Sequence, residues 1–150
     1  MERYTIIADQ NTATGDVTWS ADSHHIAWLK DLPGDVPASQ LWTASADGSS
    51  LVKLADLKGY AETPPYSPDG AKLAILYIGD MPRVAGPLQP MTPLAGVVGE
   101  KIFEQRVVVV DLGTKKWTQV TPADVYVYES DWMPDSNGWA VIAAHGSGDN

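Results

Sequence analysis

A repeated pattern constrains this chain more than any other feature of its sequence. Three segments align, VTWSADSHHIAWL from Val17, PPYSPDGAKLAIL from Pro64 and SDWMPDSNGWAVI from Ser130. Each places an aromatic residue three positions before an aspartate, then a short polar stretch and an alternating apolar run. Asp, Asn, Ser and Gly turn a chain sharply, and alternation is the period of a β-strand. Each segment therefore predicts a β-hairpin.

The repeat residues are expected to be structural. The turn residues in the three copies are Asp22, Asp69 and Asp135. The aromatic residues are Trp19, Tyr66 and Trp132, and recurrence at one place in a repeat predicts that they pack in the core between neighbouring blades. Trp42 and Trp117 lie in later hairpins, where one of them is a candidate for an exposed interface residue.

The length of the repeat predicts propeller blades. The first two segments are each followed by a second hairpin pattern, QLWTASADGSSLVKLAD at Gln40 and RVVVVDLGTKKWTQVTP at Arg106. Two hairpins make a four-stranded unit, and units of ~40 to 45 residues with four strands are typical of β-propellers. An insertion rich in proline and glycine lengthens the second unit, and we expect it to form a long surface loop.

The predicted fold class is all-β, a partial β-propeller of about three four-stranded antiparallel blades with eleven strands in a single domain, 1–150. Propellers close with ~4 to 8 blades, so this arc does not close by itself. We expect a homodimer in which two chains form a six-bladed ring, the first strand of each completing the last blade of the other. The predicted parts are a lone strand at 4–8, a blade at 16–55, a blade at 61–121 with its inserted loop at 79–105, and half a blade at 127–144.

Charge and composition exclude several classes of protein. The chain has 10 Lys and Arg against 19 Asp and Glu, a formal charge of -9, which disfavours nucleic acid and anionic membranes as partners. It has no Cys, hence no disulfide, thiolate metal site or thiol nucleophile, and its compartment stays undetermined. We expect no signal peptide in the chain, because the start lacks a charged region followed by an apolar one. No apolar run approaches the ~20 residues of a membrane span.

No metal or other cofactor is predicted. His24 and His25 are adjacent, so in a strand they point to opposite faces, and a solvated turn is the favoured interpretation there. His145 lies far from both in the sequence. The stretch from Asp135 to Gly138 resembles the start of a calcium loop but lacks the closing glutamate, which favours a turn that caps itself.

The three copies, at WSADSHHIAW, YSPDGAKLAI and WMPDSNGWAV, resemble the TolB-like Trp-Ser-Pro-Asp-Gly repeat. That repeat occurs in periplasmic TolB proteins and in the N-terminal propeller of the prolyl oligopeptidase family of serine peptidases. The stretch GPLQPMTPLAGVVGEKIFEQRVVVVDL is more similar to the dipeptidyl-peptidase-like members. The chain departs from the repeat at Ala21, at Met133, and at Ser23 and Ser136, which replace glycine.

The resemblance implies a module without catalytic residues. Peptidases of this kind carry their Ser, Asp and His in a separate α/β-hydrolase domain, and no G-x-S-x-G motif occurs in this chain. We therefore expect no enzymatic activity and a role in binding protein or peptide, or in scaffolding. Two alternatives stay open, a substrate-gating part of a full-length serine peptidase and a TolB-like periplasmic protein-interaction module.

The resemblance also implies a binding site in the inserted segment. In dipeptidyl-peptidase-like propellers, glutamates of such a segment hold the free amino terminus of the substrate, which places Glu100 and Glu104 in that role with Arg106 beside them. The alternative is a solvated loop with a Glu–Arg surface pair, worth at most ~1 kcal/mol.

Overall fold

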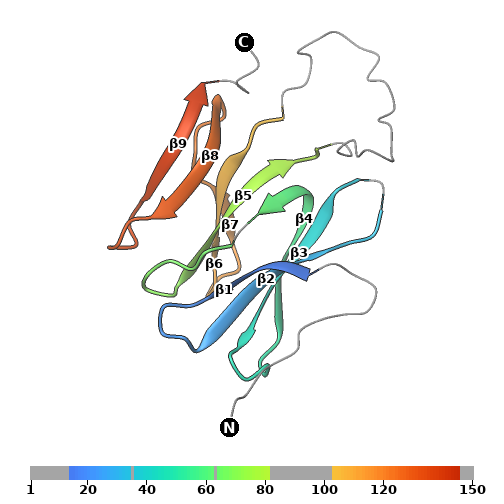
Figure 1. Ribbon diagram of the computed structural model, residues 1–150, viewed down its shortest axis with the longest axis vertical. Helices are drawn as coiled ribbons and strands as arrows, with labels where there is room; N and C mark the ends of the chain where they lie inside the picture. Colours follow the sequence, from blue (N-terminus) through green and yellow to red (C-terminus); the bar gives the residue numbers. More distant parts are fainter. Residues whose placement is uncertain (1–13, 35, 63, 82–102, 146–150) are drawn as a thin grey trace.

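The computed structural model describes residues 14–34, 36–62, 64–81 and 103–145. In that part of the chain every regular element is a β-strand, and all strand pairs are antiparallel (Figure 1). The predicted strand at 4–8 and most of the predicted inserted loop lie outside the described residues. The strands are β1 (Thr14–Trp19), β2 (His25–Asp31), β3 (Ala38–Ser45), β4 (Val52–Glu62), β5 (Lys72–Gly79), β6 (Arg106–Asp111), β7 (Trp117–Gln119), β8 (Val125–Trp132) and β9 (Trp139–His145).

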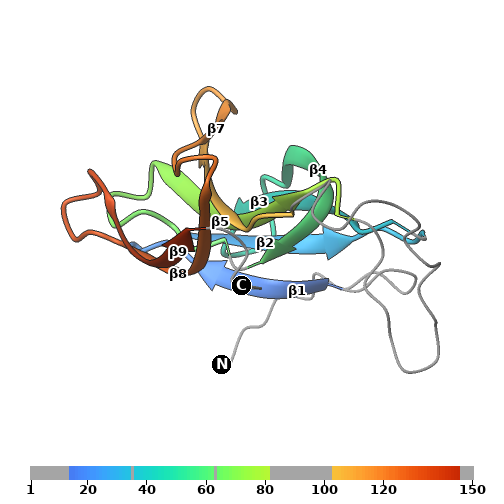
Figure 2. The same cartoon turned by 90° about the horizontal axis from the view of Figure 1, so that it is seen from above.

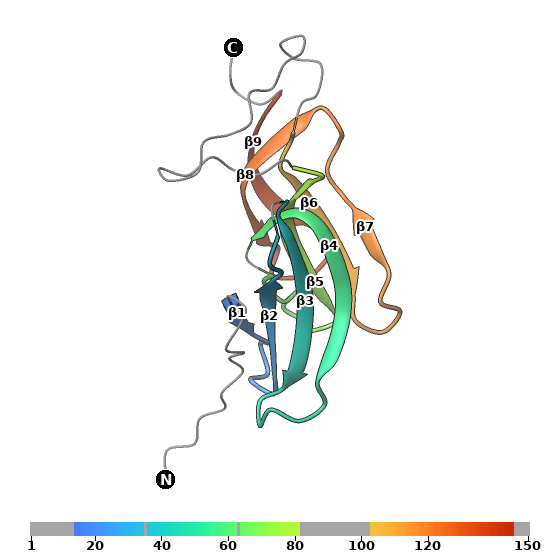
Figure 3. The same ribbon diagram turned by 90° about the vertical axis from the view of Figure 1, so that its right-hand side faces the viewer.

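The strand β4 joins two blades. Its first part, up to Lys58, pairs with β3, and its last part, from Gly59, pairs with β5. Figure 3 shows the strong curvature of β4 between these two neighbours. At Gly59 the backbone has φ +127°, and a Cβ would lie 2.0 Å from the carbonyl oxygen of Ile78. Only glycine fits this close approach, so the change of partner depends on that residue.

The fold is a partial, open, propeller-like arc, which confirms the predicted fold class. The first blade comprises β1, β2, β3 and the first part of β4, and the second comprises the last part of β4 with β5, β6 and β7. The β8–β9 hairpin forms a separate two-stranded sheet at the other end of the molecule from β1 to β3 (Figure 1). Seen from above, β1 and β7 lie on opposite sides (Figure 2). No helix that is long and apolar enough to cross a membrane occurs among the described residues.

Two apolar clusters hold the arc together. Between the two blades, fully buried Leu41 packs with Leu73 and Ile75. Between the second blade and the hairpin, Val107 packs with Val127. Burial of such side chains contributes ~1.5 to 3 kcal/mol each, so both clusters stabilise the contact between neighbouring repeats.

The three repeat turns adopt one geometry. In each, the residue after the aromatic donates its backbone N–H across the turn, from Ser20 to His25, from Ser67 to Lys72 and from Met133 to Gly138, at 2.8 to 2.9 Å. The residue after each aspartate has positive φ, 61° at Ser23, 73° at Gly70 and 61° at Ser136. The turn is therefore repeated even where serine replaces glycine.

A serine and an aspartate brace the first two turns. Ser20 Oγ donates to Asp22 Oδ1 and Ser67 Oγ donates to Asp69 Oδ1, both at 2.6 Å. These hydroxyls, followed by backbone N–H groups, lower the pKa of both carboxyls. Met133 takes the place of the serine in the third copy, which has no such brace.

Two of the repeat aromatics pack backwards onto the preceding blade. Tyr66 Oη lies 2.8 Å from Thr43 Oγ1, and Trp132 Nε1 donates to the Pro65 carbonyl at 3.1 Å. Both rings are buried. Trp19 is 56 % exposed, so its prediction as core was wrong. The physical reason is that Trp19 belongs to the first repeat, and no blade precedes it among the described residues.

Candidate functional site

Of the three residues predicted to bind a ligand, the structure brings two together. Glu104 lies two residues before Arg106, which is the first residue of β6. Arg106 Nη2 lies 3.4 Å from Glu104 Oε2, and the Glu104 side chain is 6 % exposed. The third residue, Glu100, lies outside the described residues. Glu104 is thus a nearly buried carboxylate, whereas the alternative interpretation was a solvated surface pair.

The segment that carries Glu104 is fastened to β8. The Val127 N–H donates to the Gln105 carbonyl at 2.8 Å, and Gln105 Nε2 donates to the Val127 carbonyl at 3.0 Å. Gln105 and Val127 are both buried. These two hydrogen bonds hold Gln105 against β8, and they therefore fix the backbone next to Glu104.

Arg106 makes a shorter hydrogen bond to another group than the one it makes to Glu104. Its Nη2 donates to the Ala123 carbonyl at 2.7 Å, and its Nη1 donates to Gln119 Oε1 at 3.3 Å. Its Nε is buried and has no hydrogen-bond partner among the described residues. A contact of 3.4 Å is long for a charge-assisted hydrogen bond, so the carboxylate of Glu104 keeps capacity to accept a shorter one.

Glu104 and Arg106 line a cavity of about 270 Å³ whose walls are partly aromatic. The rings of Tyr77 and Trp117 meet edge to face with centroids 6.3 Å apart, and Phe103 also lines the cavity. Burial raises the pKa of Tyr77, with a further contribution from Asp80, and its hydroxyl donates to the Lys58 carbonyl. Trp117 is 53 % exposed, so its side chain is also in contact with solvent.

The sequence carried no signal for the aromatic wall. Tyr77 pairs with Arg106 across β5 and β6, and Trp117 pairs with Val110 across β6 and β7. These registers place residues from three strands around one cavity. Trp117 was singled out as an interface candidate, but its relation to Glu104 depends on strand pairing that spans the inserted segment.

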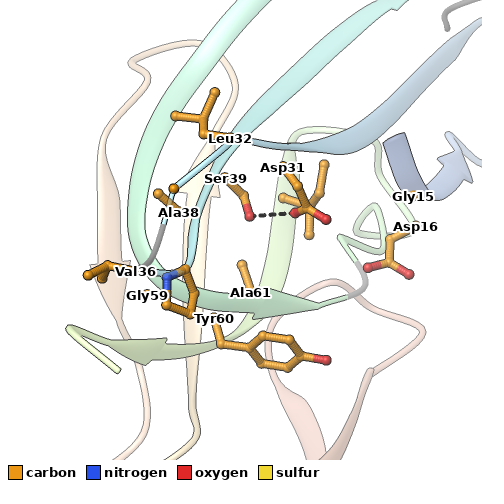
Figure 4. A pocket seen from close by; sticks show the side chains of 13 residues that line it. Gly15, Asp16, Asp31, Leu32, Val36, Ala38, Ser39, Gly59, Tyr60 and Ala61 are labelled. Atoms are coloured by element: carbon orange, nitrogen blue, oxygen red, sulfur yellow. Dashed lines mark hydrogen bonds between the residues drawn. The ribbon is translucent and has the colours of Figure 1, made fainter. Parts of the chain in front are cut away.

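A second cavity, of about 380 Å³, lies in the first blade, beside the end of β2, the start of β3 and the last part of β4 (Figure 4). It is lined by Asp16, Asp31 and Tyr60 together with glycines and apolar residues. Ser39 Oγ donates to Asp31 Oδ1 at 2.9 Å, and the hydroxyl of Tyr60 donates to Glu62. That bond, burial and the surrounding carboxylates raise the pKa of Tyr60 to about 12. This cavity has carboxylates and no cationic lining, so it lacks the paired charges of the Glu104 cavity.

Metal-binding groups do not gather in the described part of the chain. No three His, Cys, Asp or Glu residues lie close enough there to hold an ion. His145 Nδ1 lies 3.6 Å from Asp124 Oδ2, and both side chains are exposed. At the third repeat turn, the Asn137 N–H donates to Asp135 Oδ1 at 3.0 Å, so that carboxylate caps its own turn.

Repeated turns, two four-stranded blades and an open end define an incomplete propeller-like domain with a charged cavity beside β6. No family model matches the chain, and no curated protein matches it. Among solved structures, it is similar to a chain from a structural and mechanistic study of two prolyl endopeptidases, concerned with inter-domain dynamics in catalysis and specificity. The match has a TM-score of 0.57 at 21 % identity and covers 93 % of this chain and 20 % of that one.

The likeness concerns the fold. At 21 % identity the match supports the propeller-like architecture, and the finer resemblance to TolB-like repeats stays a prediction. This chain spans about one fifth of the length of the prolyl endopeptidase chain that it matches.

Proposed function

We propose that this chain is a non-catalytic propeller-like module that binds the amino-terminal end of a peptide in the Glu104 cavity. The observation that carries the proposal is the Glu104 carboxylate, 6 % exposed, in a cavity with aromatic walls. A buried carboxylate is costly unless a cation neutralises it. Arg106 does so at 3.4 Å, which leaves room for a closer cation.

A peptide ammonium group fits this chemistry. It has three N–H donors, which match the acceptor-only oxygens of Glu104, and cations are attracted to the faces of aromatic rings such as Trp117. The formal charge of -9 on the chain favours the approach of a cationic end.

Calorimetric titration with short peptides tests the proposal. We expect a tetrapeptide with a free amino terminus to bind at least tenfold more tightly than its N-acetylated form. Glu104→Gln should remove that difference, because an amide carries no charge to pair with the ammonium. Affinity should also fall above about pH 8, where α-amino groups lose their proton.

The matched control is Glu129→Gln, which removes an exposed carboxylate on β8 away from the cavity. It should leave the preference for the free amino terminus intact. Circular dichroism verifies that both variants keep the β-sheet signal. Equal affinity for free and acetylated peptides in the unchanged chain would contradict the proposal.

The module is proposed to bind without cleaving. Its sequence holds no G-x-S-x-G motif. Incubation with proline-containing peptides, followed by mass spectrometry, should return the peptides intact. Hydrolysis that persists after further purification, and that a substitution in this chain abolishes, would contradict the proposal that the module does not cleave peptides.

A second candidate function is substrate gating within a longer serine peptidase. It is favoured by the match to about one fifth of a prolyl endopeptidase chain. Sequencing the DNA that flanks the coding region distinguishes a peptide-binding module from a gating part of a longer peptidase. An in-frame segment encoding a hydrolase domain with a nucleophile motif would favour gating.

A further inference from the structure

The strand β9 is apolar and exposed on both faces. Val141 is 45 % exposed and Ile142 is 61 % exposed, and consecutive residues of a strand point to opposite faces. Ala140 and Ala143, which flank them, are exposed as well. One edge of β9 pairs with β8, and no strand pairs with its other edge in the part of the chain that the structure describes.

The other sheet edges of the described chain are protected. β1 carries an irregularity in register between Gly15 and Thr18, with Asp16 at φ 53°. β7 has three residues and follows Lys115 and Lys116. Bulges, short length and lysines are devices that prevent edge-to-edge pairing. The outer side of β8 is bonded to Gln105.

β9 has none of these devices. It is seven residues long, and from Trp139 to Ala144 it contains no charged residue and no proline. Its pairing with β8 is irregular only on the β8 side, between Val127 and Glu129, so β9 itself runs straight through seven registered positions. A long, regular, apolar edge is a template for another strand.

We propose that β9 pairs antiparallel with β9 of a second copy of this chain, about a two-fold axis near Ile142. The two hairpins then form one four-stranded sheet, with the strand number of each complete blade. This pairing differs from the predicted six-bladed ring, in which strand 4–8 of one chain completes the last blade of the other.

The sequence of β9 suits pairing with itself. About Ile142, antiparallel pairing places Val141 beside Ala143 and Ala140 beside Ala144, and it opposes no two charges. The carboxylates that lie across from the middle of β9 are Glu129 and Asp131 of β8, which pair with Ile142 and Ala140. Three strand spacings separate them from their counterparts, ~14 Å, which exceeds the Debye length of ~8 Å at physiological salt. The charge of -9 is therefore compatible with this contact.

Light scattering after size exclusion tests the pairing. A single strand edge buries less than the ~800 Å² per partner of a standard interface, so we expect dissociation in the micromolar range. At about ten times that concentration the mass should approach twice 16.1 kDa. Ile142→Lys should return it to 16.1 kDa, because the two lysines would face each other across the axis.

Val17→Lys is the matched control, since Val17 is 52 % exposed on β1 at the other end of the arc. It should leave the dimer intact. Ile142→Thr keeps a β-branched side chain and should weaken the dimer less than Ile142→Lys. The proposal would be overturned by a dimer that survives Ile142→Lys or by one that Val17→Lys dissociates. A monomer at every concentration up to about 1 mM would also overturn it, because the dimer would then be much weaker than the expected micromolar dissociation constant.

Cysteine cross-linking fixes the register, because the chain contains no Cys. Single cysteines at 140, 141, 142 and 143 should give a disulfide-linked dimer fastest at the position nearest the axis. Opposed Cα atoms there lie ~4.5 to 5.5 Å apart, within the range for a disulfide. A cysteine at 17 should stay unlinked, and equal linking at 17 and 142 would contradict β9 pairing.

Discussion

β6 and β9 have nearly the same apolar character and opposite surroundings. β6 reads RVVVVD, and its four valines are at most 8 % exposed. β9 reads WAVIAAH, and four consecutive residues in its middle are exposed. β6 lies between β5 and β7, with the first blade on one face and the hairpin on the other. β9 has a neighbour on one side, and the described chain covers neither face of it fully.

The difference shows that strand composition alone does not set burial. A continuous apolar run is typical of a strand covered on both faces. For β6 the cover comes from the same chain, with Val110 in one apolar cluster and Val107 and Val109 in the other. β9 has the apolar composition of a strand covered on both faces, but the described residues do not cover it. This difference is the physical basis for the proposed pairing with a second copy.

The largest effect is expected from truncating matched isoleucines in the two regions. Ile75 is 1 % exposed in the cluster between the blades, and Ile75→Ala should lower the free energy of unfolding by about 3 kcal/mol. Ile142→Ala on β9 should change it by less than about 0.5 kcal/mol. Urea unfolding at submicromolar concentration, below the expected dissociation constant of the dimer, measures both. Equal losses of unfolding free energy in the two variants would contradict the difference in burial between the two regions.

An intermediate effect is expected at the repeat turns. Ser67 is fully buried, and its Oγ accepts from the Lys72 N–H at 2.9 Å while it donates to Asp69. Ser67→Ala should cost about 2 kcal/mol, since it removes a hydrogen bond to the Asp69 carboxylate and one from the Lys72 N–H. Met133 occupies the same place in the third turn and is 45 % exposed, so Met133→Ala should be nearly neutral. Thermal unfolding compares the two variants, and a neutral Ser67→Ala would show that the brace is dispensable.

The smallest effect concerns the positive φ angles. Ser23 is exposed with φ 61°, and Ser23→Gly should raise the free energy of unfolding by roughly 0.5 kcal/mol, because glycine adopts this conformation without strain. Ser136 has the same φ, but its Oγ accepts the Asp69 N–H at 3.0 Å. Ser136→Gly should therefore be destabilising, by about 1 kcal/mol. A gain in stability at Ser136 would mean that this contact between turns contributes little.

Part of the candidate site was predictable and part was not. The resemblance placed Glu104 and Arg106 beside each other, and the structure brings the two side chains together at the start of β6. The burial of Glu104 and its aromatic wall were not predictable. They depend on Tyr77 and Trp117, which reach the cavity through pairings of β5, β6 and β7 across the inserted segment. Local patterns carry no information about such registers.

The sequence by itself determined the repeated turns and the all-β class, because turn residues and alternation act within a few positions of the chain. It also determined that an aromatic recurs at Trp19, Tyr66 and Trp132. Only the tertiary structure decided which of these rings is buried. Each buried ring packs on the blade before it, and Trp19 has none in the described chain, so identical local signals end in different surroundings.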